Sequence, residues 1–479
     1  MNEKKQFYFC KMPRKIKREL FEDLEVVDIN SKGAGVVKSK DGKVIFVQGV
    51  VPGDRVTIEI YKKKRGFFEA RLIGIDHPSP NRVTPVCVHF GVCGGCKWQN
   101  LNYKTQLKFK QKEVIHNLKN LSGMVLPKID EIKAAENPYF YRNKMEYAFS
   151  DKRWLTAEEI KLKKKNLEKN GLGFHKSGMW DKVVDIEKCH LQKDPANNIR
   201  NSVKKFALDN YLAFFNPREK SGFLRTLMIR NSNQGEFMVL IQFYRENKEQ
   251  REAILSHLKD KFDLTALLYC INSKANDTLY DQEIKIYDGS EFITEVMEGL
   301  KFRVNAKSFF QTNAEQAFEL YKIAREFAGL KGHELVYDLY TGTGTIALFI
   351  ADKCKKVVGV ESVPEAVAVA KENAEINGIK NTFFEVGDMR KVFNLDFINR
   401  HGRADLVITD PPRNGMHPDV IKHLLMLAPN KIVYISCNNA TQARDLNLMK
   451  EKYKLSKCRA LDMFPQTQHI ENVVLLEKI

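Results

Sequence analysis

The sequence has no long apolar run. None of its windows approaches the length of apolar chain that is needed to cross a lipid bilayer. Near the N-terminus there is only a four-residue apolar patch, Phe7 to Cys10, which lies between charged residues, so we expect no signal peptide. Nothing in the sequence directs the chain to a membrane or out of the cytosol, and we therefore expect a cytoplasmic protein.

The sequence also lacks the composition of a small secreted scaffold. It holds nine cysteines in 479 residues, and in a cytoplasmic protein these are better explained as metal ligands, a nucleophile or core residues than as disulfides. A hydrophobic content of 43% and a charged content of 29% are typical of a soluble globular protein. The length is sufficient for about three domains.

Acidic residues are scarce relative to basic ones. There are 60 Asp and Glu against 78 Lys and Arg, a net charge of +18. Residues 1–75 carry +7 and residues 306–479 carry only +2, which leaves +9 for residues 76–305. A solvated lysine-rich surface would give the same total, but the uneven distribution favours binding of nucleic acid by the front of the chain and chemistry at the back.

Short strands punctuated by glycine begin near Leu24: EVVDIN, GAGVVK, KVIFVQG, DRVTIEIYKKK and FFEARLIGI. Five strands in so short a stretch predict a small closed β-barrel of the OB type, which we place over residues 16–76. The basic run Lys62 to Arg65 lies beside Phe67 and Phe68, an arrangement that suits single-stranded nucleic acid. The region resembles the TRAM domain, an RNA-binding barrel attached to several RNA-modifying enzymes.

Three cysteines surround a Gly-Gly turn within ten residues: Cys87, Cys93 and Cys96. They predict a metal site, because glycines let backbone amides approach thiolate sulfurs. A fourth ligand must come from elsewhere, and we expect Cys189 rather than Cys10 or Cys270. From spacing alone, structural zinc and an iron–sulfur cluster are equally compatible with four thiolates. We assign this site to a central domain over residues 77–305 that mixes strands and helices.

One helix is predicted at the start of this central domain. Residues 101–120 read as an amphipathic basic helix, with Leu107, Val114 and Leu118 on or near one stripe.

The third domain, over residues 306–479, alternates strands and helices as a doubly wound parallel sheet does. The segment ELVYDLYTGTGTIALFIA reads as a strand, a glycine turn and a helix, and a second strand ends at Glu361, 19 positions beyond Gly342. Glycines admit a nucleotide to the backbone, and the carboxylate accepts hydrogen bonds from ribose hydroxyls. These features predict an α/β, Rossmann-like domain.

The glycine turn alone leaves the cofactor open. Gly342-x-Gly344-x-x-Ala347 also matches the dinucleotide fingerprint, so an NAD-dependent dehydrogenase fits this motif. Two features favour S-adenosylmethionine: Asp338 precedes the turn in the order D-L-x-x-G-x-G, common in methyltransferases, and Asp388 follows the third strand, where adenine contacts usually lie. The two aspartates could instead be turn and cap residues.

Cys437 follows a run of β-formers at the carboxyl end of a predicted strand, where open α/β sheets bind ligands. Seen alone, it is better explained as a buried core residue. A preceding strand ends at Asp410-Pro-Pro-Arg413, whose prolines hold the loop rigid, and the closing segment contains Glu471. In amino-methyltransferases the related tetrapeptide ends in an aromatic residue, so Arg413 disfavours methylation of an exocyclic amine.

These residues suit methylation of carbon 5 of uracil. That carbon is a poor nucleophile until a thiolate adds at carbon 6, and a base must then remove the carbon 5 proton so that the thiolate can leave. We predict that Cys437 is the nucleophile and Glu471 the base. Asp410 and Arg413 could orient the base edge and stabilise the enolate charge.

On these motifs the chain resembles the RNA uracil-carbon-5 methyltransferases that have a TRAM domain and an iron–sulfur cluster and that modify 23S ribosomal RNA. The resemblance covers nearly the whole chain. It implies a four-iron, four-sulfur cluster on four cysteines: Cys87, Cys93, Cys96 and Cys189. It implies that S-adenosylmethionine is bound by four further residues: Gln311, Tyr340, Glu361 and Asp410. The roles that it implies for Cys437 and Glu471 are again nucleophile and base.

The sequence departs from this family at two positions. Asn439 stands where the loop after the nucleophile usually has proline, and Asn472 follows the predicted base where a small hydroxyl residue is common. Neither departure removes a reacting atom.

The resemblance implies structured RNA, specifically 23S ribosomal RNA, as the substrate, with the target uridine flipped out. Transfer RNA is the closest alternative, because related enzymes methylate it with the same chemistry. No protein partner is implied, and we expect a monomer. Two other classes remain: an RNA-binding module with an inactive methyltransferase domain, against which Cys437, Glu471 and Asp410 argue, and a dehydrogenase, against which the Asp-Pro-Pro-Arg loop and the four cysteines argue.

Overall fold

The computed structural model describes residues 19–161 and 167–479. Contacts divide the chain into two compact units, one reaching to Thr84 with Asn100–Asn102, the other formed by residues 85–99 and 103–479. Among the described residues, no helix combines the length and the apolar character that a membrane span requires. Cys10 and the predicted start of the barrel at residue 16 lie outside the described ranges, and the predicted domain limits stay predictions.

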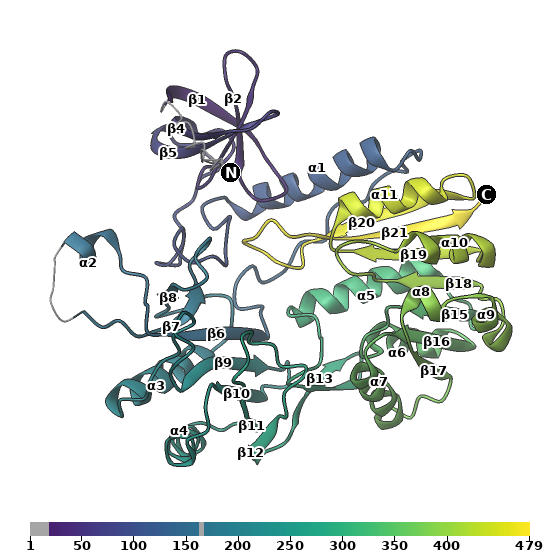
Figure 1. Cartoon of the computed structure of the whole chain (residues 1–479). Coiled ribbons are helices and arrows are strands. Elements are labelled where there is room, and N and C mark those ends of the chain that lie inside the picture. Colours follow the sequence, from purple (N-terminus) through teal and green to yellow (C-terminus); the bar gives the residue numbers. More distant parts are fainter. Residues whose placement is uncertain (1–18, 162–166) are drawn as a thin grey trace, which may run out of the picture. The chain divides into compact units, whose positions relative to one another are not determined.

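The first unit contains a closed barrel of five strands in the order β1-β2-β3-β5-β4 (Figure 1). Its strands are β1 (Glu19–Ile29), β2 (Gly35–Lys38), β3 (Val44–Val47), β4 (Arg55–Lys63) and β5 (Phe68–His77). Alternate residues of β4, namely Val56, Ile58 and Ile60, point into the barrel and are buried there. On its surface the Lys64 ammonium lies 5.0 Å from the centre of the Phe67 ring. The predicted five-stranded barrel is confirmed.

The second unit begins with a seven-stranded sheet in the order β12-β11-β10-β9-β6-β7-β8. Its strands are β6 (Lys144–Ser150), β7 (Gly171–His175), β8 (Val183–Asp185), β9 (Leu224–Asn231), β10 (Phe237–Phe243), β11 (Ala266–Ile271) and β12 (Lys285–Gly289). The helices of this region are α2 (Ala157–Lys161), α3 (Ala196–Asp209) and α4 (Lys248–Lys261). One face of the sheet packs on α3 and α4, and the predicted mixture of helices and strands is confirmed.

The other face of this sheet joins the core of the C-terminal region. Met228, Leu240 and Leu268 belong to one continuous hydrophobic cluster with the hairpin β13 (Phe292–Met297) and β14 (Leu300–Asn305) and with the C-terminal sheet. The active-site region is therefore built on a core that both sheets share.

The C-terminal sheet has the order β17-β16-β15-β18-β19-β21-β20. Its strands are β15 (Leu335–Leu339), β16 (Lys356–Glu361), β17 (Thr382–Val386), β18 (Leu406–Thr409), β19 (Lys431–Ser436), β20 (Tyr453–Leu461) and β21 (Glu471–Lys478). The first five in this spatial order are parallel, and β21 and β20 complete the sheet in antiparallel fashion. This arrangement confirms the predicted doubly wound domain.

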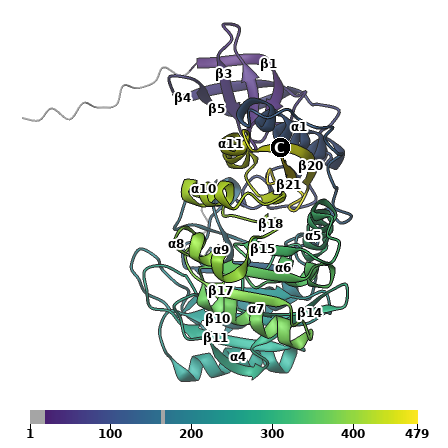
Figure 2. The same cartoon turned by 90° about the vertical axis from the view of Figure 1, so that its right-hand side faces the viewer.

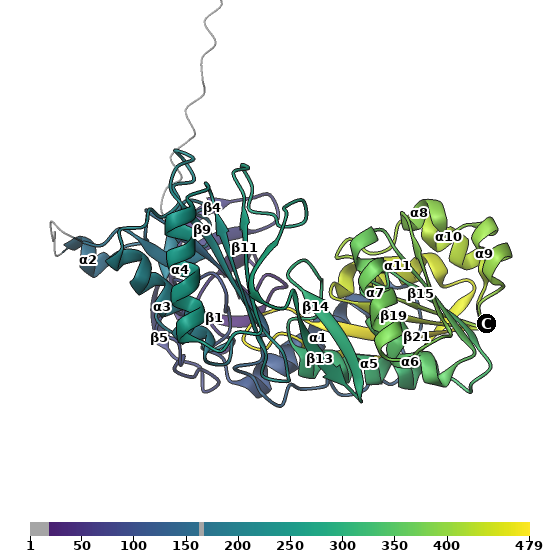
Figure 3. The same cartoon turned by 90° about the horizontal axis from the view of Figure 1, so that it is seen from below.

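Helices cover both faces of this sheet (Figure 3). One face carries α5 (Ala314–Ala328), α6 (Thr345–Ile350), the 3₁₀ turn η1 (Ala351–Lys353) and α7 (Pro364–Ile376). The other carries α8 (Met389–Val392), α9 (Leu395–His401), α10 (Pro418–Leu427), α11 (Asn439–Met449) and α1 (Tyr103–Leu121).

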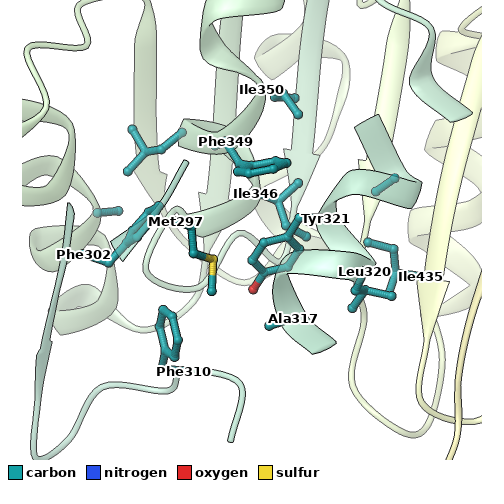
Figure 4. Close-up of a cluster of buried hydrophobic side chains, with 14 of the residues drawn as sticks. Met297, Phe302, Phe310, Ala317, Leu320, Tyr321, Ile346, Phe349, Ile350 and Ile435 are labelled. Carbon is teal, nitrogen blue, oxygen red and sulfur yellow. The ribbon is translucent and has the colours of Figure 1, made fainter. Parts of the chain in front are cut away.

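The side chains of strand β19 show why helices must cover both faces of the sheet. Its side chains alternate, so Ile432 and Tyr434 enter one core and Val433 and Ile435 the other. A strand that is apolar on both sides must be buried on both sides. Figure 4 shows Ile435 in the second core, near Leu320 of α5.

Helix α1 runs alongside α11 (Figures 1 and 2). The helix predicted over 101–120 is confirmed, and Val114 and Leu118 are fully buried. Lys110, however, does not lie on a basic surface. Its ammonium is completely buried and donates to Asp462 Oδ1 at 2.5 Å, so this lysine serves the core rather than RNA binding.

Candidate active site

One cavity of about 1020 Å³ brings together all six residues predicted for cofactor binding and catalysis. They are Gln311, Tyr340, Glu361, Asp410, Cys437 and Glu471. Four of them lie at or just past the carboxyl ends of parallel strands: Tyr340 after β15, Glu361 at the end of β16, Asp410 after β18 and Cys437 after β19. The cavity is therefore where an open α/β sheet binds its ligand.

The glycine turn after β15 is held tightly. Gly342 and Gly344 have φ values of +57° and +76°, a region that glycine enters without strain. A Cβ at Gly344 would approach Ala370 and Phe384 to 2.9 Å, whereas a Cβ at Gly342 would meet open space. Gly344 is thus needed for helix packing, and Gly342 leaves room on the cavity side.

The Glu361 carboxylate is fixed beside this turn. It accepts hydrogen bonds from the backbone N–H of Gly342 at 3.2 Å, of Ser362 at 2.6 Å and of Val363 at 3.0 Å. These bonds hold the carboxylate against the cavity wall, where it can accept hydrogen bonds from a ribose.

The two other aspartates of the nucleotide-binding pattern are turn and cap residues. The Thr341 hydroxyl donates to buried Asp338 at 2.5 Å, and burial raises the pKa of Asp338 to about 7. Asp388 caps α8 by accepting from the backbone N–H of Arg390 at 2.9 Å, and Arg390 lowers the pKa of Asp388 to about 2. Neither Asp338 nor Asp388 lines the cavity. Their hydrogen bonds are those of a turn residue and a helix cap.

The predicted nucleophile and base face each other across two strands. In the antiparallel pair β19–β21, Ser436 is opposite Asn472. Cys437 comes directly after the first and Glu471 directly before the second, so the next position along the ladder places these two residues opposite each other. The two strands thus bring the predicted nucleophile and the predicted base to the same cavity.

Electrostatics in the cavity favour protonated groups. Burial raises the pKa of the Cys437 thiol to about 11, helped by the carboxylates of Glu471 and Asp410. Glu471 is buried next to Asp410, and both effects keep its pKa well above that of an ordinary glutamate. Burial, with Asp338 nearby, raises the pKa of Asp410 to about 7. The Arg413 guanidinium acts in the opposite direction on Cys437 and Glu471.

The loop after β18 is hydrogen-bonded to the turn that carries Cys437, the predicted nucleophile. The backbone oxygen of Arg413 accepts a hydrogen bond from Asn438 Nδ2 at 3.0 Å and another from the Thr441 hydroxyl at 3.1 Å. Asn438 also caps α11 by accepting from the N–H of Ala440 at 3.2 Å. Asn438 therefore fixes Cys437 and Arg413 relative to each other.

The departure at Asn439 has a structural explanation. Helix α11 begins at this residue, which is the position where proline is favoured. Here the side chain is buried, and its amide bridges two residues of α1: it donates to the Glu113 carboxylate and accepts from Asn117 Nδ2. Asn439 thus joins the nucleophile turn to α1.

The segment that carries Gln311 is held from the central sheet. Asn143 Nδ2 donates to the backbone oxygen of Gln311 at 3.1 Å and to Glu295 at 3.3 Å. The buried Arg230 guanidinium donates to the backbone oxygens of Asn305 at 2.7 Å and Ser308 at 3.0 Å. No local pattern marks Asn143, Arg230 or Glu295 as supporting residues, because their partners lie far away in the sequence.

A second cavity, also of about 1020 Å³, collects the cysteines predicted as ligands: Cys87, Cys93, Cys96 and Cys189. The backbone N–H of Gly95 approaches Cys93 Sγ to 3.5 Å, as the Gly-Gly turn predicted. Asn197 holds both backbone groups of Cys189, at 2.8 and 3.2 Å. Cys270 lies on β11 in the hydrophobic core and does not line this cavity.

Three of the four cysteines pack against the hydrophobic core of the central region: Cys93, Cys96 and Cys189. Burial raises the pKa of Cys93 to about 11 and that of Cys96 to about 12. His89 lines the cavity, but its Nε2 already accepts from the N–H of Glu187 at 3.0 Å. Within residues 19–161 and 167–479, no three His, Cys, Asp or Glu side chains are arranged to hold a metal ion.

The two cavities share a wall. Ser308, Phe309 and Thr312 line both of them. The loop before β21 also links the regions, because the N–H groups of Lys97 and Trp98, which follow Cys96, donate to the backbone oxygen of Gln466 at 2.9 and 3.0 Å.

Comparison with known proteins gives this arrangement a family. The sequence model of the tRNA (uracil-5-)-methyltransferase family matches residues 222–479. An uncharacterized RNA methyltransferase of Porphyromonas gingivalis is 49% identical over 95% of this chain and 99% of its own length. One of Bacteroides thetaiotaomicron is 50% identical over 93% and 99%.

A solved structure is similar over almost the whole chain. It is the tRNA (uracil-54, C5)-methyltransferase of Pyrococcus abyssi in complex with S-adenosyl-L-homocysteine. It is 29% identical, has a TM-score of 0.73, and the match covers 94% of this chain and 99% of that one. The chain therefore belongs to the tRNA (uracil-5-)-methyltransferase family, S-adenosylmethionine-dependent enzymes that methylate carbon 5 of uracil in RNA.

Proposed function

We propose that this enzyme methylates one specific uridine of 23S ribosomal RNA through a covalent bond between Cys437 and carbon 6 of the base. The observation that carries the proposal is the pairing of β19 with β21, which sets Cys437 opposite Glu471 in a cavity lined by the predicted cofactor residues. A thiol and a base on one side of a flipped uracil are what this chemistry requires.

S-adenosylmethionine supplies an electrophilic methyl group when it is bound. The cavity suits it: Gly342 has no side chain in the way, and the fixed Glu361 carboxylate can accept hydrogen bonds from ribose hydroxyls. We assign the remaining contacts to Gln311, Tyr340 and Asp410. These residues would hold the methyl donor in the cavity that Cys437 also lines.

The thiolate of Cys437 adds to carbon 6, and the electron pair of the carbon 5–carbon 6 double bond moves into an enolate. Carbon 5 then forms a bond to the methyl group as the methyl–sulfur bond of the donor breaks. Arg413 assists, because its positive charge favours the thiolate and offsets the enolate charge. At this stage the base carries both a methyl group and a proton on carbon 5.

Glu471 completes the cycle by removing the carbon 5 proton. The electron pair of that carbon–hydrogen bond restores the double bond, and the carbon 6–sulfur bond breaks to release the Cys437 thiolate. A glutamate whose pKa is raised by burial and by Asp410 is a stronger base than an exposed one. One proton leaves for each methyl group transferred.

We further propose that the four cysteines lining the second cavity hold a four-iron, four-sulfur cluster. Their shared cavity and the approach of the Gly95 amide to Cys93 Sγ support this assignment. A cluster is wider than a single ion, so its ligands need not meet at one metal-sized point. The cluster would cross-link the segment Cys87–Cys96 to Cys189, and no step of methyl transfer passes through it. Anaerobic purification should yield brown, iron-containing protein, and a colourless, iron-free product would contradict the assignment.

For the barrel we propose the TRAM role of RNA binding, supported by the basic run Lys62 to Arg65 and the nearby Phe67.

We also propose that the enzyme acts as a cytoplasmic monomer, because a single chain supplies all six residues of the active-site cavity. Light scattering coupled to size exclusion would detect a dimer.

Transfer RNA is a second candidate substrate. The Pyrococcus abyssi structure is named as a tRNA (uracil-54, C5)-methyltransferase, and its likeness extends over 94% of this chain, including the N-terminal part.

The test measures methyl transfer from labelled S-adenosylmethionine to transcripts of 23S ribosomal RNA and of transfer RNA, with the methylated positions mapped. We expect 5-methyluridine at one position of the ribosomal transcript. Methylation of transfer RNA alone would favour the second candidate, and 5-methyluridine on neither would contradict both.

A further inference from the structure

Two fully buried amides connect the strand that ends at the nucleophile with the strand that begins at the base. Asn472 Nδ2 donates to Gln442 Oε1 at 2.7 Å. Gln442 Nε2 donates in turn to the backbone oxygens of Asn472 at 3.2 Å and Tyr434 at 2.9 Å. Both side chains have no exposed surface. A single amide thus contacts β19, β21 and, through its own backbone, α11.

Most of the polar groups of the pair are engaged in hydrogen bonds within the core. Both hydrogens of Gln442 Nε2 are used, its oxygen accepts from Asn472, and Asn472 Oδ1 accepts from the Cys458 thiol at 3.4 Å. Since an unpaired buried amide is costly, the two side chains can exchange these partners only together. Four hydrogen bonds therefore hold the connection at once.

The position of the pair relates it to the reacting groups. Asn472 is the residue after Glu471, and Gln442 lies in the first turns of α11, where its backbone N–H donates to the oxygen of Asn438 at 3.0 Å. Asn438 is the residue after Cys437. Asn472 is therefore the direct chain neighbour of Glu471. Gln442 is connected to Cys437 through its hydrogen bond to Asn438. Neither amide lines the cavity.

We propose that Gln442 and Asn472 are positioning residues that set the distance and angle between the Cys437 thiol and the Glu471 carboxylate. The proposal rests on the proposed roles of those two residues. Addition of the thiolate and removal of the proton occur at adjacent carbons of one ring, so the two side chains must be aligned to a single base. The pair holds the N-terminal end of β21, the strand that begins at Glu471.

The amide pair includes Asn472, a position at which the chain departs from the family that it resembles. A small hydroxyl at position 472 could not span the gap to α11 that the amide of Asn472 closes. The surroundings are apolar, because Tyr434 and Cys458 belong to the core on that face of the sheet. The amide pair is thus a polar connection inside an apolar core, which gives directional alignment where apolar packing would give only proximity.

The first experiment uses Asn472→Ala with ordinary uridine RNA and follows two quantities, the turnover number and the fraction of RNA held as a denaturant-resistant adduct. Proton removal should slow more than addition, because Glu471 is the residue displaced. We expect the turnover number to fall roughly 10- to 100-fold, the adduct fraction to rise, and KM for RNA to stay within twofold of the native value. An unchanged adduct fraction would overturn the proposal.

A second variant separates alignment from stability. Asn472→Ala leaves Gln442 partly unpaired, so it also lowers stability. In Gln442→Met/Asn472→Leu both side-chain amides are replaced by apolar groups of similar size, while the backbone oxygens of Asn472 and Tyr434 lose a donor, so part of the lost Tm should return. We expect this double variant to keep the raised adduct fraction. If the adduct fraction returned to the native value along with Tm, the pair would be a stability feature only.

The matched control is Asn381→Ala. Asn381 is also an amide with two hydrogen bonds, to the backbone oxygens of Ala351 at 2.8 Å and Cys354 at 3.1 Å. It precedes β17, at the amino edge of the sheet and away from the cavity. We expect a lower Tm with the adduct fraction of the native enzyme, and a rise like that of Asn472→Ala would count against the proposal.

Failure of the proposal and failure of the proposed function remain distinguishable. RNA containing 5-fluorouridine should form an adduct with the native enzyme and none with Cys437→Ala. If that result is obtained and the Asn472 variants show native adduct fractions, only the positioning role is wrong. If no adduct forms with the native enzyme, the proposed function itself is wrong.

Discussion

At the scale of single residues, the surroundings of Cys437 oppose the role of nucleophile that we propose for it. Burial and two carboxylates raise the pKa of its thiol, and Arg413 is the positive group that counteracts them. A protonated thiol protects the free enzyme from oxidation and alkylation, because only the thiolate is reactive. The reaction therefore depends on charges that favour the thiolate when substrate and cofactor are in place.

Cys437→Ala removes the atom that bonds to carbon 6. We expect no covalent complex with 5-fluorouridine RNA and methyl transfer below detection, since no second cysteine lines the cavity among the residues that the structure describes. Denaturing gel electrophoresis of labelled RNA measures the complex. Cys354→Ala, which changes a buried cysteine outside the cavity, is the control and should still form it. A complex that persists without Cys437 would contradict its role.

Glu471→Gln should have a different signature. Addition to carbon 6 and methyl transfer do not need the carboxylate, whereas removal of the carbon 5 proton does. We expect the turnover number to fall roughly 100-fold or more, while a methylated adduct accumulates on ordinary uridine RNA. Mass spectrometry of the trapped complex should find the methyl group on the base, and an adduct without it would assign Glu471 to an earlier step.

Arg413→Met should move the pH dependence. The rate of adduct formation rises with pH as the thiol ionises. Arg413 lowers the thiol pKa, so its loss raises that pKa and displaces the acid limb of the profile to higher pH. Adduct formation with 5-fluorouridine RNA, measured between pH 6 and 10, tests this. Arg459→Met removes an arginine that donates to Glu131 outside the cavity and should leave the profile unchanged.

At the scale of elements, the sequence predicted what local pattern can encode. The runs of β-formers and the turn residues after them placed Tyr340, Glu361, Asp410 and Cys437 at strand ends, and parallel pairing then brought them together. The burial of Lys110 could not be predicted in this way. Its partner Asp462 lies 352 positions away, and a lysine on an amphipathic helix normally faces solvent.

The link between α1 and α11 leads to a prediction for Asn439→Pro. Proline suits the first position of a helix, so the backbone should accept the change. The half-buried Glu113, however, loses the amide that donates to it, and we expect a loss of about 1 kcal/mol in the free energy of unfolding. Urea denaturation measures it. Asn439→Pro/Glu113→Leu removes the orphaned group and should recover most of the loss, and a more stable Asn439→Pro would contradict the explanation.

At the scale of the whole molecule, the charge distribution indicated the kind of partner, but the sequence did not indicate which RNA is the target. The excess of positive charge ahead of residue 306 predicted a nucleic-acid partner, and membership of an RNA methyltransferase family agrees with it. The choice between ribosomal and transfer RNA depends on the shape of the bound RNA. Asn143 and Arg230 support the cavity through hydrogen bonds to residues that are far away in the sequence. No sequence pattern at these residues indicates which RNA is bound.

The barrel gives the prediction that belongs to this scale. Replacing Lys62, Lys63, Lys64 and Arg65 together by alanine removes four positive charges from the barrel and none from the active-site cavity. If all four contact phosphates of single-stranded RNA, the slope of log affinity against log salt concentration should become shallower by about 3. Competition with the barrel carboxylates Glu19 and Glu69, which pair with three of these lysines, would make the change smaller.

The control places a similar loss of charge elsewhere. Lys353, Lys355 and Lys356 lie at the start of β16, at the amino edge of the sheet and outside both cavities. Their replacement by alanine should leave the salt slope unchanged. In the barrel variant the turnover number at saturating RNA should stay within twofold of the native value, because charges that recruit RNA act on binding and not on the bond-forming steps. An unchanged salt slope would show that RNA does not use this hairpin, and binding would then have to be sought on the central domain.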